Sequence, residues 1–468
     1  MILINPLRRL TMSREGSPQQ FDPVDKGKKP LIFLAAASAT NIITYGFFAT
    51  FGVFREYYFK NAPFEGNQEV AYIGPIGLGL IQGLCPLLVY FCNKYPSKSM
   101  LLLWLGALLI VASTAGAAFA TTPLGLVMTL GVLYGFGGCC IFAPCSVLID
   151  GWFIERRTLA NGIFFAASSA APACLSPLFS FTLNHYSPKA TLVGWAVFCA
   201  VLSLTALPFV VPRRYPQERL APEESTMSDS DIDEKGRVTY RFWTQPVFYI
   251  LCLTTITQGL GHFLPTLYLP TFATDLGAPD RDASLLITYY NVICIVIQPL
   301  GGALVDRIGP LIPLVVTTLV TSVSILTIWG FGKTYPPLVA LMFLFGASSG
   351  GFVVLRSSLA TQIVIRNKQH TKASTKLEKR TNESLVSGVL MSARGVAFVV
   401  SGFVGKAIVQ KSENIPIGPG YGAGKWKSLI LFTGIIMGVA SFGSLGLIKR
   451  PEASKCNPEE SEHEAVSL

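Results

Sequence analysis

Long apolar runs alternate with short polar segments along most of the chain. Each run holds about the 20 mostly apolar residues that an α-helix needs to cross a bilayer, and a long polar stretch divides the runs into two sets of six. The runs cover residues 31–54, 71–92, 99–119, 123–149, 158–182, 191–212, 245–270, 284–305, 310–331, 336–364, 384–409 and 427–448. This pattern predicts an all-α membrane protein with 12 transmembrane helices.

The polar segments predict the domain organisation. The stretch between the two sets mixes six basic with seven acidic residues, which is typical of a solvated, flexible tether. When both termini are placed in the cytoplasm, most of the Lys and Arg residues fall on the inner side, as the positive-inside rule requires. We therefore expect a cytoplasmic tail at 1–30, a first six-helix bundle at 31–212, a cytoplasmic linker at 213–243, a second bundle at 244–450 and a disordered cytoplasmic tail at 451–468.

Composition supports the membrane class and excludes others. Charged residues make up 14% of the chain, against about 25% in a typical soluble protein. The net charge of +10 does not indicate nucleic-acid binding, because the charges cluster between apolar runs rather than along one face. We expect a multi-pass protein of the plasma membrane with a monomeric functional unit. Its expected partners are the lipid bilayer and a small-molecule substrate, with no nucleic acid.

The residue pattern is not that of an enzyme or a metalloprotein. Nine of the ten cysteines lie in or at the edge of apolar runs, and none has metal-ligand spacing with any of the four histidines. The chain also lacks an acid–base pair or nucleophile constellation in its sequence pattern. The expectation is therefore no catalytic site, no metal and no cofactor.

The two sets of six runs resemble each other at nearly constant spacing. "TYG" at 44–46 corresponds to "TQG" at 257–259, and "LYGFGGCCIFAPCS" at 133–146 to "LFGASSGGFVVLRS" at 344–357. "LANGIFFAAS" at 159–168 corresponds to "LVSGVLMSAR" at 385–394. The spacings of these pairs are 213, 211 and 226 residues. Repeated halves are typical of transporter folds, in which substrate binds between the halves near the middle of the membrane.

Two motifs resemble those of known transporters. "GGALVDRIG" at 301–309 is similar to the cytoplasmic motif of the major facilitator superfamily through Gly302, Asp306, Arg307 and Gly309. The resemblance implies the major facilitator fold, with two pseudo-symmetric six-helix bundles that alternate between inward and outward access.

The second motif, "GWFIERRTLANG" at 151–162, resembles the signature of the monocarboxylate porter family. The matching positions are Trp152, Phe153, Arg156, Arg157, Leu159, Ala160 and Gly162. The segments "FGVFREYY" at 51–58 and "GHFLPTLYLPTFATDLG" at 261–277 look like those of its fungal-type members.

The chain also departs from that family. The acidic-Gly-aromatic motif expected before the first helix is replaced by "DKGKKPLIFL". Ala49, Cys294 and Gln298 stand where proton–lactate porters carry a lysine, an aspartate and an arginine. Proton–lactate symport is therefore not inferred from the resemblance.

Three ionisable residues, Arg356, Arg394 and His262, lie well inside apolar runs rather than at their ends. A charge within the membrane is costly, so each is a functional hypothesis. The Arg356 guanidinium suits a carboxylate substrate, although its side chain could instead extend toward the membrane surface. Arg394 is a candidate for substrate contact or a gating ion pair. His262 is a candidate proton-titrating group or hydrogen-bond donor, or a histidine satisfied by its neighbours.

Further polar residues complete the candidate substrate site. Gln258 lies one helical turn before His262 and shares its face. Tyr45 and Asn291 are additional candidates, with helix–helix hydrogen bonding as the alternative role.

The charged loop before the fifth run is a candidate gate. Arg156 and Arg157 are expected to hold this loop on the cytoplasmic side. The pseudo-twofold arrangement should also bring Asp306 near it, where the carboxylate can meet Arg156, Arg157 or the positive end of the fifth helix.

These features favour a secondary-active or facilitative transporter of small, monocarboxylate-like organic anions that works by alternating access. The first alternative is an efflux transporter for a larger fungal-type metabolite. The second is a receptor that binds a solute without transporting it.

Overall fold

The computed structural model describes residues 25–213, 241–368 and 376–447, apart from residues 26, 63, 66, 67 and 413. All regular secondary structure in these residues is helical, and 12 helical segments are long and apolar enough to cross a membrane. The all-α membrane fold predicted from the runs is thereby confirmed. The predicted linker and both predicted tails lie mostly outside the described residues.

Each set contributes six spans. In the first set these are formed by α1 (Lys28–Lys60), α2 with α3 (Ile73–Gly83, Cys85–Lys94), α4 (Ser99–Ala117), α5 with α6 (Pro123–Leu126, Tyr134–Trp152), α7 (Arg157–His185) and α8 (Pro188–Ala206). In the second set they are formed by α9 (Pro246–Asp275), α10 (Asp280–Ile308), α11 (Leu311–Ser324), α12 with α13 (Tyr335–Ser348, Phe352–Lys368), α14 (Lys376–Lys411) and α15 (Lys427–Ala440).

Several helices are longer than the apolar runs that predict them. α10 extends the run 284–305 by about one turn at each end, to Asp280–Ile308. The largest difference is at 366–383, which the apolar pattern assigns to a loop, whereas α14 already begins at Lys376. Hydropathy alone misses this extension, because residues such as Lys and Glu are good helix formers although they are not apolar.

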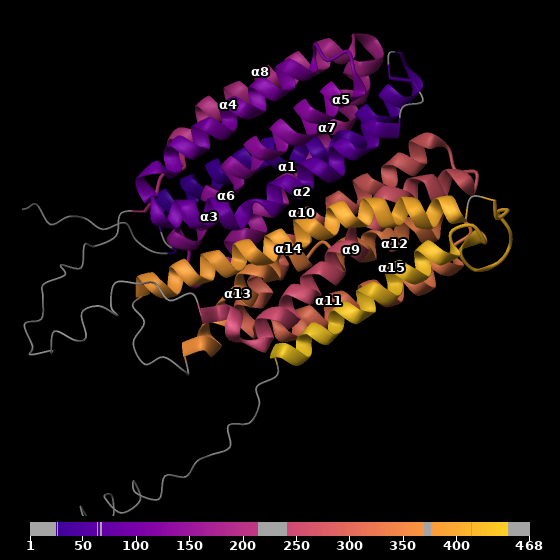
Figure 1. Cartoon of the computed structure of the whole chain (residues 1–468). Coiled ribbons are helices and arrows are strands. Elements are labelled where there is room, and N and C mark those ends of the chain that lie inside the picture. Colours follow the sequence, from indigo (N-terminus) through magenta and orange to yellow (C-terminus); the bar gives the residue numbers. More distant parts are fainter. Residues whose placement is uncertain are drawn as a thin grey trace, which may run out of the picture.

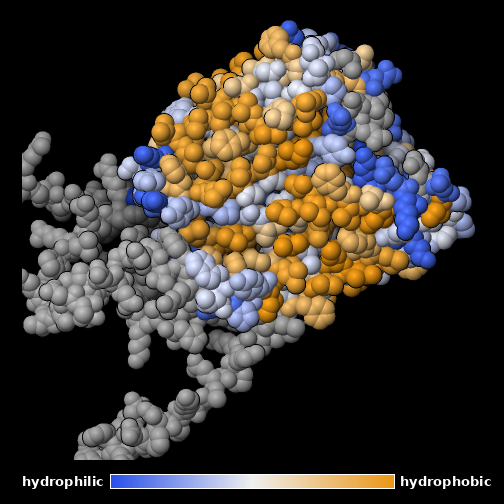
Figure 2. Space-filling view, in the orientation of Figure 1, coloured by the Kyte–Doolittle hydropathy of each residue, from blue (hydrophilic) through white to orange (hydrophobic). Residues whose placement is uncertain are grey.

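The two sets form two packed groups, indigo to magenta and pink to yellow in Figure 1. The seam between them is made by α7 against α10 and by α14 against α2 and α3. The outward faces carry large apolar side chains, for example Leu101, Leu105 and Leu108 on α4, and Figure 2 shows a broad hydrophobic surface across both groups. Such a surface suits hydrocarbon rather than water.

Close backbone approach at the seam requires glycine. A Cβ atom added to Gly162 on α7 would lie 2.9 Å from Pro299 Cα on α10. A Cβ atom added to Gly388 on α14 would lie 3.2 Å from Pro86 Cα on α3. These two contacts are related by the sequence repeat, so both halves of the seam are built in the same way.

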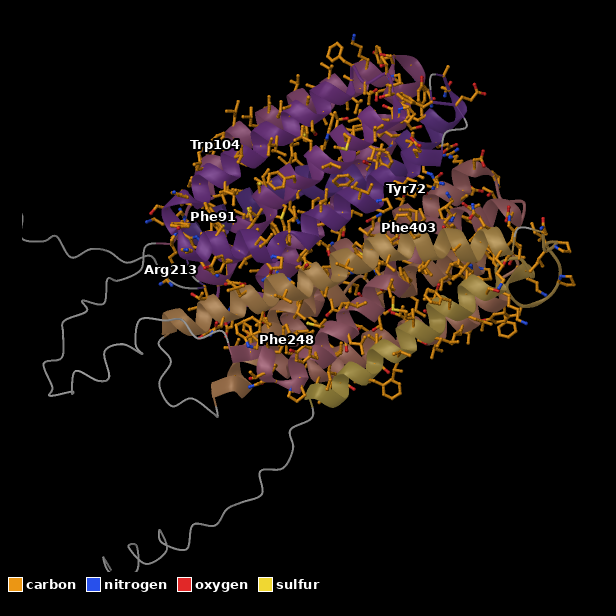
Figure 3. The ribbon with its side chains drawn as sticks, in the orientation of Figure 1. Tyr72, Phe91, Trp104, Arg213, Phe248 and Phe403 are labelled. Atoms are coloured by element: carbon orange, nitrogen blue, oxygen red, sulfur yellow. The ribbon has the colours of Figure 1, made fainter. Side chains whose placement is uncertain are left out.

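The two ends of the seam differ. We call the end where α1 and α7 begin and α10 ends the Arg157 end. At the opposite end, the Tyr72 and Phe403 rings stack across the seam at 5.7 Å, and Lys406 Nζ donates to the Tyr72 hydroxyl at 3.2 Å. Figure 3 shows Tyr72 and Phe403 facing each other between the two groups. An aromatic stack and one hydrogen bond therefore join the two groups at this end of the seam.

Gly302→Ala tests the close packing at the Arg157 end. The new methyl group would overlap Thr158 O and lie 2.8 Å from Leu159 Cα. We expect a loss of about 1–3 kcal/mol of stability, as for other overpacked interiors, seen as a lower melting temperature of the purified protein. The matched control is Gly301→Ala, where no atom lies within 4 Å of the new methyl group. Equal melting temperatures for the two variants would contradict the proposed packing.

Candidate functional site

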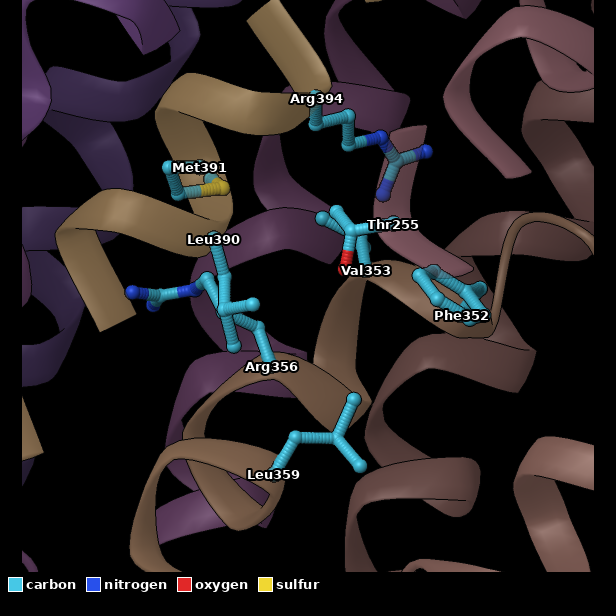
Figure 4. Close-up of a pocket in the computed structure, with 8 residues that line it drawn as sticks. All are labelled: Thr255, Phe352, Val353, Arg356, Leu359, Leu390, Met391 and Arg394. Carbon is cyan, nitrogen blue, oxygen red and sulfur yellow. The ribbon is translucent and has the colours of Figure 1, made fainter. Parts of the chain in front are cut away.

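Two arginine side chains are buried in the second set of helices. Arg356 on α13 and Arg394 on α14 expose only 6% and 5% of their surface. Both line a small pocket with room for about one water molecule. The other lining residues are Thr255, Phe352, Val353, Leu359, Leu390 and Met391. Figure 4 shows the two guanidinium groups pointing in opposite directions, so the arginines do not form a joint clamp.

Arg356 connects the two sets of helices. Its Nη1 donates to Ser146 Oγ on α6 at 3.3 Å and to Ser387 Oγ on α14. Its Nη2 donates to Asn161 Oδ1 on α7 at 3.0 Å. The alternative that Arg356 extends toward the membrane surface is wrong, because its side chain is buried between α6, α7 and α14. Much of its hydrogen-bonding capacity is already used by neutral groups of the protein.

Arg394 has a different environment. Its guanidinium carbon lies 5.9 Å from the centroid of the Phe352 ring and 5.3 Å from that of Phe398. Within the described part of the chain the side chain makes no hydrogen bond or ion pair, and its Nε is buried without a partner. A buried cation without an anionic partner is costly, which makes Arg394 the stronger candidate for contact with an anion.

His262 on α9 belongs to a polar cluster beside Arg394. Its Nδ1 lies 2.6 Å from Ser349 Oγ, and its Nε2 lies 3.3 Å from the Tyr290 hydroxyl. The imidazole also stacks on Phe398 with a centroid distance of 6.1 Å. Neighbouring groups therefore satisfy both ring nitrogens, while His262 and Arg394 share one aromatic side chain.

The remaining predicted polar contacts differ in their surroundings. Gln258 Nε2 donates to Ser349 Oγ at 3.2 Å and so belongs to the His262 cluster. The Tyr45 hydroxyl is buried without a partner among the described residues, within electrostatic reach of both pocket arginines. Asn291 Nδ2 donates to Ile287 O of its own helix at 2.8 Å, so the structure gives it a local role.

A second charged group lies where α6, α7 and α14 meet. Arg157 donates from Nε and Nη2 to the two oxygens of Asp150, at 2.6 and 2.5 Å. Its Nη1 donates to Glu383 Oε2 at 2.6 Å and to Thr361 Oγ1 at 3.3 Å. Asp150 belongs to the first set and Glu383 to the second. This Arg157 cluster therefore joins the two halves through one arginine.

The repeat relates the members of the Arg157 cluster. Arg157 and Glu383 are 226 residues apart, which is the spacing of the third repeat match. Asp150 and Thr361 have the spacing of the second match, 211 residues. Equivalent positions of the two halves thus meet each other, as expected near a pseudo-twofold axis.

Asp306 caps the start of α7. Its Oδ1 accepts from the backbone N–H of Thr158 at 3.0 Å, and its Oδ2 accepts from that of Leu159 at 2.9 Å. Of the three partners considered from sequence, the structure shows the positive helix end rather than Arg156 or Arg157. A carboxylate here satisfies two otherwise unpaired N–H groups and complements the helix dipole.

The motif glycines have structural explanations, whereas the two remaining motif arginines lie at the surface. Gly309 ends α10 with a φ of 79°, a left-handed conformation that favours glycine. Gly162 and Gly302 allow the close approach of α7 and α10. Arg156 and Arg307 are exposed at the Arg157 end.

Sequence reasoning misses the acids that pair with Arg157. Asp150 stands just beyond a predicted run and Glu383 in a predicted loop, yet both are buried in the structure. The repeat carries a usable signal for Glu383, because this residue occupies the position equivalent to Arg157. Thr255 and Phe352, which line the pocket, look like ordinary helix residues in the sequence.

Comparison with protein-family models gives a match to the Major Facilitator Superfamily over residues 84–375 and 251–468. Rat monocarboxylate transporter 3 is 27% identical over 345 residues, which cover 72% of this chain and 68% of that one. The MFS-type transporter pytF of Aspergillus terreus is 28% identical over 61% of this chain and 93% of its own. Mouse monocarboxylate transporter 4 is 26% identical over 51% of this chain, and the match spans about half, 49%, of that relative's length.

Two solved structures share the fold. The proton:xylose symporter XylE aligns with a TM-score of 0.66 at 13% identity, over 90% of this chain and 96% of its own. The fucose:proton symporter of E. coli aligns with a TM-score of 0.60 at 15% identity, over 90% and 100%. With the family match over most of the sequence, these 12 membrane-spanning helices in two repeated sets identify the chain as a member of the Major Facilitator Superfamily of transporters.

Proposed function

We propose that the protein transports small monoanionic organic acids by alternating access, and that Arg394 binds the carboxylate of the substrate. The observation that carries this proposal is the buried Arg394 guanidinium, which has no ion pair or hydrogen bond within the described chain. A carboxylate would supply the missing charge and accept charge-assisted hydrogen bonds. The relatives named as monocarboxylate transporters support the same substrate class.

Charge balance supports a single negative charge on the substrate. The buried carboxylates of the described chain, Asp150 and Glu383, both pair with Arg157, whereas Arg356 donates to neutral side chains. Arg394 is a single buried cation with no ion pair among the described residues, which favours a ligand with one negative charge. The apolar and aromatic lining of its pocket favours an acid with an apolar body.

The contacts at the two ends of the seam support the alternating mechanism. The Arg157 cluster and the Asp306 cap hold the Arg157 end closed, and they must separate for substrate to pass there. The Tyr72, Phe403 and Lys406 contacts act in the same way at the opposite end. We propose that the Arg157 end faces the cytoplasm and that a monomer in the plasma membrane performs transport without a cofactor.

The second candidate is a carrier that exports a larger metabolite. The observation that favours it is the mostly apolar lining of the Arg394 pocket, which also suits the apolar body of a larger molecule. Competition distinguishes the two, because a carrier for small acids is inhibited by pyruvate or benzoate, whereas a site for a larger apolar molecule is not.

Arg394→Gln tests the proposed binding residue. In proteoliposomes, uptake of radiolabelled pyruvate or benzoate should show a KM raised at least about tenfold, because a hydrogen bond to a charged group contributes about 1.5–3 kcal/mol. Arg281→Gln, which removes an exposed arginine from α10, is the control and should leave the KM unchanged.

Arg356→Gln gives a contrasting result in the same assay. Because Arg356 bonds to both halves, we expect a lower maximal rate with little change in KM. If Arg394→Gln takes up the acid with the same KM as the parent protein, the assignment of Arg394 as the binding residue is wrong. Absence of uptake for every tested mono- and dicarboxylate would overturn the proposed substrate class.

Glu383→Gln tests the Arg157 cluster as a closing contact. Ser357 is buried beside the cluster, so a cysteine placed there by Ser357→Cys should react slowly with a membrane-impermeant maleimide. Loss of one charge-assisted hydrogen bond destabilises the closed arrangement by about 1.5–3 kcal/mol. The cysteine should therefore be labelled at least about tenfold faster.

The labelling experiment requires a background without Cys174, which is exposed, and without Cys456. Glu155→Gln is the matched control, because Glu155 is exposed although it lines the same pocket as Arg157, Ser357 and Glu383. The same labelling rate in both variants would show that the Glu383 pair does not hold this end closed.

A further inference from the structure

We infer that the protein is an obligatory anion exchanger: it reorients quickly when an anion is bound to Arg394 and slowly when it is empty. This inference rests on the proposed function and adds the mode of transport. The observation behind it is that the chain does not provide a counter-ion for Arg394 in its described centre.

The positions of the described Asp and Glu residues show that none of them is a counter-ion for Arg394. Asp150 and Glu383 are the buried carboxylates of the described chain, and both pair with Arg157. Asp306 is used at the start of α7. Asp275, at the end of α9, pairs with Lys425. No described carboxylate lines the pocket of Arg394.

Alternating access makes the missing counter-ion a barrier to the empty carrier. Between its two open states the protein must pass through a closed one, in which Arg394 faces Phe352 and Phe398 and little water remains. A cation in such a place is poorly compensated. A bound carboxylate supplies the compensation in the closed state, where water cannot, and so lowers the barrier to reorientation.

A proton does not remove this barrier. The nearest titratable groups around Arg394 are His262 from α9, Tyr290 from α10 and Tyr45 from α1. Protonation of His262 adds a second positive charge beside Arg394 instead of cancelling it. The tyrosine hydroxyls are neutral in ordinary conditions. An internal Asp or Glu could replace the substrate charge after release, but the described centre has none.

The test compares loaded with empty vesicles. Purified protein is reconstituted into liposomes that contain either unlabelled pyruvate or buffer, with the membrane potential clamped by potassium and valinomycin. Uptake of radiolabelled pyruvate is then measured, and benzoate is used in parallel. We expect uptake into loaded vesicles to be at least about tenfold faster, which corresponds to a barrier difference of about 1.4 kcal/mol.

A designed counter-ion provides the second measurement. Thr255 lines the pocket together with Arg394, so Thr255→Glu places a carboxylate beside the unmatched cation. We compare the rate of uptake into loaded vesicles with the rate into empty vesicles. The ratio of these rates should fall toward one in Thr255→Glu and stay high in Thr255→Gln, in which an uncharged side chain of the same shape replaces the carboxylate.

The outcomes separate the two proposals. Equal uptake by loaded and empty vesicles of the parent protein would overturn exchange and leave acid transport in place. Uptake into empty vesicles driven by a pH gradient alone would also overturn it, in favour of proton coupling. Failure to move any tested acid under either condition would overturn both proposals. If Thr255→Glu does not fold, the comparison on the parent protein still decides.

Discussion

Compensation of charge in a low-dielectric interior is the constraint on which the rest of the structure depends. The membrane surrounds the helices with hydrocarbon, so a buried ion must find its partner inside the protein or in a ligand. Arg157 finds two carboxylates, one in each half. Arg356 is held by neutral groups of both halves and lies within reach of Asp150. Arg394 alone has aromatic rings where a partner would stand, and the proposed substrate and mode of transport both follow from that difference.

The sequence repeat explains why the two sides of the seam are packed in the same way. Gly162 lies against Pro299 and Gly388 against Pro86, so equivalent residues form both sides of the seam. Near the pseudo-twofold axis, the equivalent positions 157 and 383 touch each other. Identical charged residues at these two positions would repel. The change to arginine in one half and glutamate in the other turns a symmetric contact into an attractive one.

Much of the fold could be predicted from the sequence, because the membrane imposes a simple requirement on helix length and polarity. The 12 runs derive from that requirement, and the matched segments of the two sets add the repeat. The site was less accessible to such reasoning. Arg356, Arg394 and His262 stand out because they are charged or titratable within apolar runs. Their separate roles depend on the direction of each side chain, which the linear pattern of apolar and polar residues does not show. Glu383 was hidden because its helix begins in a polar segment.

Cys294 and Gln298 stand where proton–lactate porters carry an aspartate and an arginine, and here both residues pack against neighbouring helices. Gln298 accepts a hydrogen bond from Ser169 of α7 at 3.3 Å and donates to Gly350 O at 3.3 Å. Cys294 packs against Gly346, with its sulfur 3.7 Å from the carbonyl oxygen. Neither residue carries a charge, so α10 supplies neither the acid nor the arginine of that mechanism. The unmatched cation lies on α14 instead, without an acid beside it. Under the proposed function, the bound anion takes the place of the missing acid and neutralises this centre.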